Sequence, residues 1–242
     1  MFLALSILAL TPSAPPAVAL KDGDRIVWIG NALAEREQRY GHWETALHCK
    51  YPERNLTVRN LGWSGDTVYG DARAGFEDAK KGYERLVSLT LELKPTIIFV
   101  SYGLNESFDG PAGVAKFQKG LEKLLDSLAP SKARVVLFSP RPFEKSRALP
   151  DPTERNKTLQ LYVQAIREVA DNRGHRYADL FFAGLDHQKN ADQRFTDNGL
   201  HLTDAGYEAT IPEFLSALGL TWSGEDPKKF DAVRMAVRKK NE

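Results

Sequence analysis

The residues Arg25–Glu35 read RIVWIGNALAE, and they predict a change from strand to helix within one short stretch. The apolar, largely β-branched run ends at Gly30, and a helical pattern begins after Asn31. In open parallel sheets, ligands bind beyond the carboxyl ends of the strands. The turn at Gly30–Ala32 is therefore the first place in this chain to look for a functional site.

The same alternation of strand and helix signals continues along the chain. Predicted strands cover 25–29, 55–60, 96–102, 133–139 and 175–181, and predicted helices cover 32–51, 81–93, 113–129, 154–174 and 204–219. Strict alternation of this kind is typical of an α/β fold, in which helices cover both faces of a parallel sheet. We therefore expect a five-stranded parallel sheet.

Composition excludes several classes of protein. The formal net charge of the 242-residue chain is +1, so nothing in its charge indicates binding to nucleic acid or to an anionic membrane surface. Cys49 is the single cysteine, which excludes an intrachain disulfide and a cysteine-based zinc site. No spacing of His, Asp and Glu indicates a metal site, and we expect no cofactor.

The two ends of the chain differ from its middle. Residues 1–19 combine an apolar run with the small residues Ala17 and Ala19, which is typical of a cleaved secretory signal and too short to span a bilayer. This predicts a secreted or periplasmic protein without a transmembrane segment. Residues 20–222 form the predicted domain. Residues 223–242 predict an appended helix with one apolar face, a candidate surface for protein contact.

Four short stretches follow predicted strands or precede the last predicted helix. They read IGNALAE, NLGWSGDTV, SYGLNES and DNGLHLTDAGY. In this order they resemble the four sequence blocks of the SGNH, or GDSL-type, hydrolases, over about residues 22–218. The resemblance implies a three-layer α/β/α, flavodoxin-like fold with strand order 2-1-3-4-5. It also implies hydrolysis of carboxylic esters, often acyl or acetyl groups on lipids or glycans.

The resemblance also assigns roles to individual positions. The first block of the family carries a nucleophilic serine after Gly-Asp, and here Asn31 and Ala32 stand at the aspartate and serine positions. Gly65 matches the glycine whose backbone N–H binds the oxyanion. Asn105 matches the asparagine that donates to the oxyanion from its side chain. The family's catalytic histidine corresponds to His201.

The residue that orients this histidine is also changed. The fourth block of the family reads Asp-x-x-His, and here Asn198 occupies the aspartate position, with Asp197 directly before it. An asparagine can orient an imidazole by hydrogen bonding but cannot stabilise the imidazolium by charge. Alanine has no atom that can attack an ester. The resemblance therefore implies an esterase domain with impaired or lost serine-dependent catalysis.

Three functional interpretations remain open from the sequence. In the first, the cleft binds a glycan or acylated glycan without turnover. In the second, His201 activates water, or Ser64 or Ser101 replaces the missing nucleophile. In the third, the chain is a non-catalytic domain of a larger secreted assembly.

Overall fold

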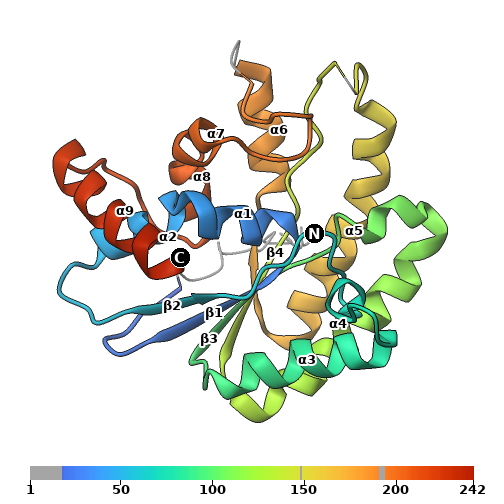
Figure 1. The fold of residues 1–242 in the computed structure, drawn as a ribbon. Helices are drawn as coiled ribbons and strands as arrows, with labels where there is room; N and C mark the ends of the chain where they lie inside the picture. The colour runs from blue at the N-terminus through green and yellow to red at the C-terminus, as the bar shows by residue number, and fades with distance from the viewer. Residues whose placement is uncertain (1–17, 148, 191–193) are drawn as a thin grey trace, which may run out of the picture.

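The computed structural model describes residues 18–147, 149–190 and 194–242. Its centre is a five-stranded sheet in the order β2-β1-β3-β4-β5, and every paired neighbour is parallel (Figure 1). The strands are β1 (Arg25–Gly30), β2 (Thr57–Asn60), β3 (Ile97–Ser101), β4 (Arg134–Phe138) and β5 (Arg176–Ala178). The predicted parallel sheet and its strand order are confirmed.

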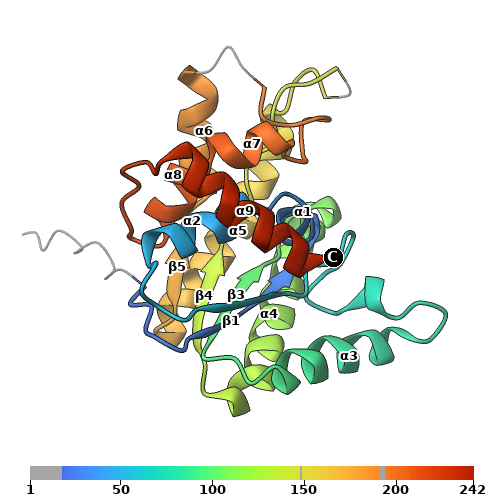
Figure 2. The same cartoon turned by 60° about the vertical axis from the view of Figure 1, so that its left-hand side comes forward.

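Helices cover both faces of the sheet and complete a three-layer sandwich (Figures 1 and 2). One layer contains α1 (Ala32–Tyr40), α2 (His42–Lys50), α7 (Asp204–Ala209), α8 (Ile211–Ala217) and α9 (Pro227–Asn241). The opposite layer contains α3 (Ala79–Glu92), α4 (Val114–Leu128) and α5 (Thr153–Arg173). A further helix, α6 (Phe181–Asn190), follows β5 directly.

The alternation of side chains along β1 creates the two hydrophobic cores. Trp28 faces α2 and α8, where its ring stacks at centroid distances of 6.0 Å on Trp43 and 5.8 Å on Phe214. Val27 and Ile29 face the opposite core under α3, α4 and α5. Because successive strand residues point to opposite faces, a central strand buried on both sides reads as a continuous apolar run.

Three helix predictions differ from the structure. The predicted helix 32–51 is two helices, because Gly41 adopts a left-handed conformation with φ of 72° and ends α1. The predicted helix 204–219 is also two, with a break at Thr210 and Pro212 in the first turn of α8. The sequence did not predict α6 at all.

The C-terminal helix α9 packs against α1 and α2 (Figure 2). Phe230 and Val237 are buried on its inner face, and Asn241 donates to the backbone carbonyl of Gln38 at 2.9 Å. This apolar face is therefore covered by the same chain, and the outer face of α9 is the part open to other proteins.

The predicted signal segment lies outside the described residues except for Val18 and Ala19. Val18 is buried, and its N–H donates to the carbonyl of Leu218 at 2.9 Å. No helix of the described chain is long and apolar enough to cross a membrane.

Val237→Ala should lower the free energy of unfolding by about 1–2 kcal/mol, because it removes buried methyl groups that contact the α1–α2 junction. Met235→Ala is the matched control, because Met235 lies on the same helix with 68% of its surface exposed. Its effect should stay within about 0.5 kcal/mol. Urea unfolding of both variants measures the difference, and equal small effects would show that α9 does not stabilise the domain.

Candidate functional site

The turn from β1 to α1 is tightly built. A Cβ atom on Gly30 would lie 2.3 Å from Oγ of Ser101, so only glycine fits beside the neighbouring strand. Asn31 caps α1, because its Oδ1 accepts from the N–H of Leu33 at 3.2 Å. Ala32 follows in the first helical turn and is buried. A methyl group therefore occupies the position where the sequence resemblance expects a nucleophilic hydroxyl.

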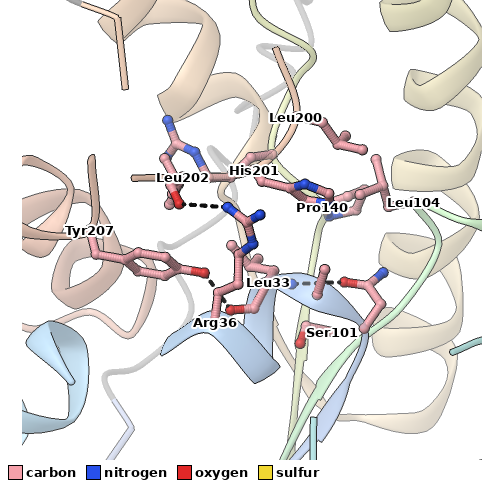
Figure 3. A pocket seen from close by; sticks show the side chains of 12 residues that line it. Leu33, Arg36, Ser101, Leu104, Pro140, Leu200, His201, Leu202 and Tyr207 are labelled. Carbon is pink, nitrogen blue, oxygen red and sulfur yellow. Dashed lines mark hydrogen bonds between the residues drawn. The ribbon is translucent and has the colours of Figure 1, made fainter. Parts of the chain in front are cut away.

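Ala32 and His201 line one pocket at the carboxyl ends of β1, β3 and β4 (Figure 3). The free space at its centre is about 20 Å³, which is room for a single water molecule. Its walls consist of Asn31, Ala32, Leu33, Arg36, Ser101, Leu104, Pro140, Arg141, Leu200, His201, Leu202 and Tyr207. The structure thus brings the first and fourth motifs together, as the resemblance implied.

The hydrogen bonds of Asn198 fix the tautomer of His201. Asn198 Oδ1 accepts from the backbone N–H groups of Leu200 and His201, at 3.0 and 2.9 Å. These two donors require the oxygen on that side, so the amide nitrogen is the atom that lies 3.1 Å from Nδ1 of His201. An amide nitrogen can only donate, and Nδ1 of the neutral imidazole must therefore accept.

This arrangement leaves the ring proton of the neutral imidazole on Nε2. Burial and the charge of Arg36 lower the pKa of His201, which favours the neutral ring. A catalytic histidine needs the opposite tautomer, with a free lone pair on Nε2 to take a proton from the nucleophile. In the geometry observed here, Nε2 is a hydrogen-bond donor.

The second and third motifs meet each other beside this pocket. The side-chain amide of Asn105 donates to the backbone carbonyl of Asp66 at 2.7 Å, and Gly65 precedes Asp66 with φ of 78°. Gly65 and Asn105 are therefore held on adjoining loops. Neither of them is among the residues that line the pocket around Ala32.

Buried carboxyl groups hold these two loops in place. Glu106 accepts from the N–H of Val68 and from the N–H of Gly103, both at 2.8 Å, and so ties the second motif to the third. Burial raises the pKa of Glu106 to about 7. Asp66 accepts from Nε of Arg73 at 2.6 Å and from the hydroxyl of Tyr102 at 2.9 Å.

Comparison with known proteins places this arrangement in a family. The sequence profile described as the GDSL-like Lipase/Acylhydrolase family matches residues 23–209, which is most of the chain. The chain belongs to this family. The match spans all four motifs, from the turn at Ala32 to the loop of His201.

Solved structures with the same fold include ester hydrolases. The acetylxylan esterase Axe2 from Geobacillus stearothermophilus has 18% identity and a TM-score of 0.66, and the alignment covers 85% of this chain and 98% of that one. LAE5, an alpha/beta hydrolase enzyme from the metagenome of Lake Arreo in Spain, has 21% identity and a TM-score of 0.66, with 84% and 99% covered. At these identities the likeness supports the fold alone. No curated protein sequence matches the chain.

The two alternative serines of this GDSL-like chain already have partners. Oγ of Ser101 accepts from the indole N–H of Trp28 at 2.9 Å and is buried in the sheet. Ser64 is exposed, and its Oγ donates to Oε2 of Glu35 at 2.5 Å. Ser64 does not line the pocket, whereas Ser101 contributes to its floor.

Sequence reasoning missed two arginines and a tyrosine in the pocket wall. Arg36 lies one helical turn after Ala32, and this i, i+4 spacing placed it on the same face of α1. Its Nη1 donates to Asp197 at 2.8 Å (Figure 3 shows the guanidinium group between Leu202 and His201). Arg141 lies in the loop after β4, outside all four motifs. Tyr207 is the last residue of the fourth motif, but the resemblance assigns no role to it.

Proposed function

We propose that this member of the GDSL-like family has lost serine-dependent ester hydrolysis and uses its cleft to bind a carbohydrate ligand. The observation that carries the proposal is the pairing of Ala32 with His201 in one pocket, with His201 held as a donor at Nε2. Ala32 lacks the oxygen that would attack an ester, and a proton on Nε2 of His201 leaves no base to activate such an oxygen. Both features therefore remove the same chemical step.

A water-based mechanism at His201 is disfavoured by the same geometry. General-base catalysis requires a lone pair directed at the proton that is to be removed. Nδ1 accepts from Asn198, and Nε2 carries the proton of the neutral ring. Water in the pocket would accept a hydrogen bond from His201 and would not be deprotonated by it.

The ligand class is inferred from the surroundings of the pocket and from the related structures. Trp63 is 53% exposed, and its backbone N–H donates to the carbonyl of Gly30 at 2.9 Å, beside the turn that carries Ala32. A half-exposed aromatic ring offers an apolar face on which a ligand ring can stack. One structural relative is described as an acetyl-xylooligosaccharide esterase, which supports a sugar as the ligand. The predicted signal segment supports a secreted or periplasmic location.

One contact favours a second candidate function. The hydrogen bond from Ser64 Oγ to Glu35 gives this hydroxyl a carboxylate acceptor, and Ser64 adjoins Gly65. Such a pair is the minimum that an activated nucleophile requires. Its position outside the pocket of Ala32 and His201 makes it the alternative and not the main proposal.

Hydrolysis of 4-nitrophenyl acetate by the native protein should be slow and should show no burst of nitrophenol, because no acyl-enzyme forms at Ala32. His201→Ala should change the rate by less than about threefold, whereas loss of a working general base costs about 10²–10⁴-fold. Stopped-flow kinetics and labelling with a fluorophosphonate measure both properties.

Ser64→Ala separates the two candidate functions. A burst or a covalent adduct that disappears in Ser64→Ala would establish the alternative nucleophile. A burst that persists in Ser64→Ala but disappears in His201→Ala would contradict both candidates.

A further inference from the structure

The polar groups around Ala32 are biased towards hydrogen-bond donors. The residues that line the pocket in the described chain include two arginines and a histidine but no aspartate or glutamate. Two of the side-chain oxygens are engaged, since Asn31 Oδ1 accepts from Leu33 and Ser101 Oγ accepts from Trp28. A ligand group that enters this pocket therefore meets mainly N–H groups.

His201 adds a donor in place of the expected base. Its Nδ1 accepts from Asn198, and Nε2 makes no hydrogen bond within the described part of the chain. The ring lines the pocket (Figure 3), so Nε2–H is available to an acceptor in that space. The lowered pKa of His201 keeps this donor neutral near pH 7.

The two guanidinium groups have further donors to offer. Arg36 uses Nη1 for Asp197 and, at 3.4 Å, for the carbonyl of Leu202. Arg141 is only 8% exposed and uses Nη1 for Glu213. Each guanidinium carries five N–H donors in a planar fork, which matches the two oxygens of a carboxylate.

We propose that the pocket at Ala32 binds the carboxylate of an acidic sugar, so that the ligand is a free acid and not an ester. This inference rests on the proposed function, in which the cleft binds and does not hydrolyse. A carboxylate accepts hydrogen bonds and donates none, which matches the groups that line the pocket. The first turn of α1 beside it adds a favourable dipole.

Asp197 competes with this ligand for Arg36. Its carboxylate is 46% exposed and accepts from Nη1 of Arg36 at 2.8 Å. Removal of its charge frees the guanidinium and removes a repulsion. Asp197→Asn should therefore strengthen carboxylate binding, whereas a purely structural ion pair between Arg36 and Asp197 predicts weaker binding.

The test is a calorimetric titration of the native protein with methyl β-D-glucuronide, with its methyl ester, and with methyl β-D-glucoside. We expect the glucuronide to bind at least roughly tenfold more tightly than both neutral ligands, because hydrogen bonds to a charged group are the stronger kind. Equal affinities for the acid and its methyl ester would overturn the proposal. Tighter binding of inorganic phosphate than of acetate would overturn the assignment to carboxylates.

Arg36→Gln should weaken glucuronide binding by roughly tenfold or more, and Asp197→Asn should strengthen it severalfold. Arg39→Gln is the matched control, because Arg39 is exposed on the same helix and does not line the pocket. Equal effects of Arg36→Gln and Arg39→Gln would show that only net charge matters and would overturn the proposal. Circular dichroism of each variant confirms that the fold is kept.

The two proposals fail in different experiments. An acyl-enzyme burst would defeat the proposed loss of hydrolysis, whatever the titrations show. Absence of a burst together with no preference for the acid would leave the proposed function standing and overturn the carboxylate inference. Nitrogen-15 shifts of His201 give a third readout, because the proposal requires the proton on Nε2 in the native protein and in the complex.

Discussion

Ala32→Ser combined with Asn198→Asp should convert the chain into an esterase for small activated acetyl esters. Ala32 already stands in the first turn of α1, in the same pocket as His201. The first substitution supplies the attacking oxygen. The second supplies a carboxylate that accepts from Nδ1–H and so moves the lone pair of the neutral imidazole to Nε2.

Neither substitution should be effective alone. Ala32→Ser places a hydroxyl opposite an imidazole that donates from Nε2, and Asn198→Asp corrects the tautomer without providing a nucleophile. An amide in place of the triad carboxylate costs roughly 10⁴-fold in rate because it selects the wrong tautomer. The esterase rate of the double variant should therefore exceed that of Ala32→Ser by about 10²–10⁴-fold, so that the double-mutant cycle is strongly non-additive.

The geometry around residue 198 permits this exchange. One oxygen of the new carboxylate can keep the hydrogen bonds from the N–H groups of Leu200 and His201, and the other replaces the amide nitrogen near Nδ1. Addition of His201→Ala to the double variant should abolish both the gained rate and the burst. A folded double variant without a burst would show that Gly65, Asn105 and His201 do not form one working site.

The fold was predictable because its signals are local and repeated. Apolar runs such as 96–102 are long enough to identify a strand buried on both faces, and the four motifs supplied the strand order. Helix breaks were less predictable. The residues on both sides of Gly41 continue a helical pattern that masks the break, although glycine is a common residue at the end of a helix. The close approach of Val237 of α9, whose Cγ1 lies 3.0 Å from where a Cβ on Gly41 would stand, joins segments far apart in sequence and leaves no local signature.

The same distinction applies to the site. The sequence identified Ala32, Asn198 and His201, because each occupies a fixed place in a motif. The tautomer of His201 could not be predicted, because it depends on which atom of Asn198 two backbone N–H groups engage. Arg141 belongs to the irregular loop after β4, and its burial against Glu213 of α8 depends on the tertiary fold. These contacts decide whether the pocket offers hydrogen-bond acceptors or hydrogen-bond donors to a ligand.

Glu37→Gln should change how stability depends on pH more than any other single substitution described for this chain. Glu37 is fully buried, and its Oε1 accepts from the N–H groups of Trp43 and Glu44 at 2.7 and 3.0 Å, which caps α2. Its other oxygen, Oε2, has no hydrogen-bond partner in the described chain. Burial raises the pKa of Glu37 from its usual 4.5 to about 8.

The raised pKa sets the sign of the effect. Between about pH 4.5 and 8 the folded state keeps a proton that the unfolded state has lost, so the free energy of unfolding falls as the pH rises. At about 1.4 kcal/mol per pKa unit, the loss from this group approaches roughly 5 kcal/mol at pH 9. A glutamine keeps the acceptor at Oε1 and does not titrate.

The unfolding curves of the two proteins should therefore cross. At pH 5 Glu37→Gln should be no more stable than the native protein, because its amide leaves a buried N–H group without a partner. At pH 9 it should be more stable by about 2–4 kcal/mol. Urea unfolding at pH 5, 7 and 9 measures this, with Glu168→Gln on the exposed face of α5 as a control that should follow the native curve.

A crossing of the two stability curves would also link the free energy of unfolding to the pocket. Glu37 and Ala32 belong to the same nine-residue helix, and Glu37 fastens its end to the start of α2. Ionisation of Glu37 therefore destabilises the junction of α2 with α1, the helix that positions Ala32 and Arg36. Parallel curves for the native protein and Glu37→Gln would show that Glu37 is ionised in the folded state, with a charge partner that offsets its burial.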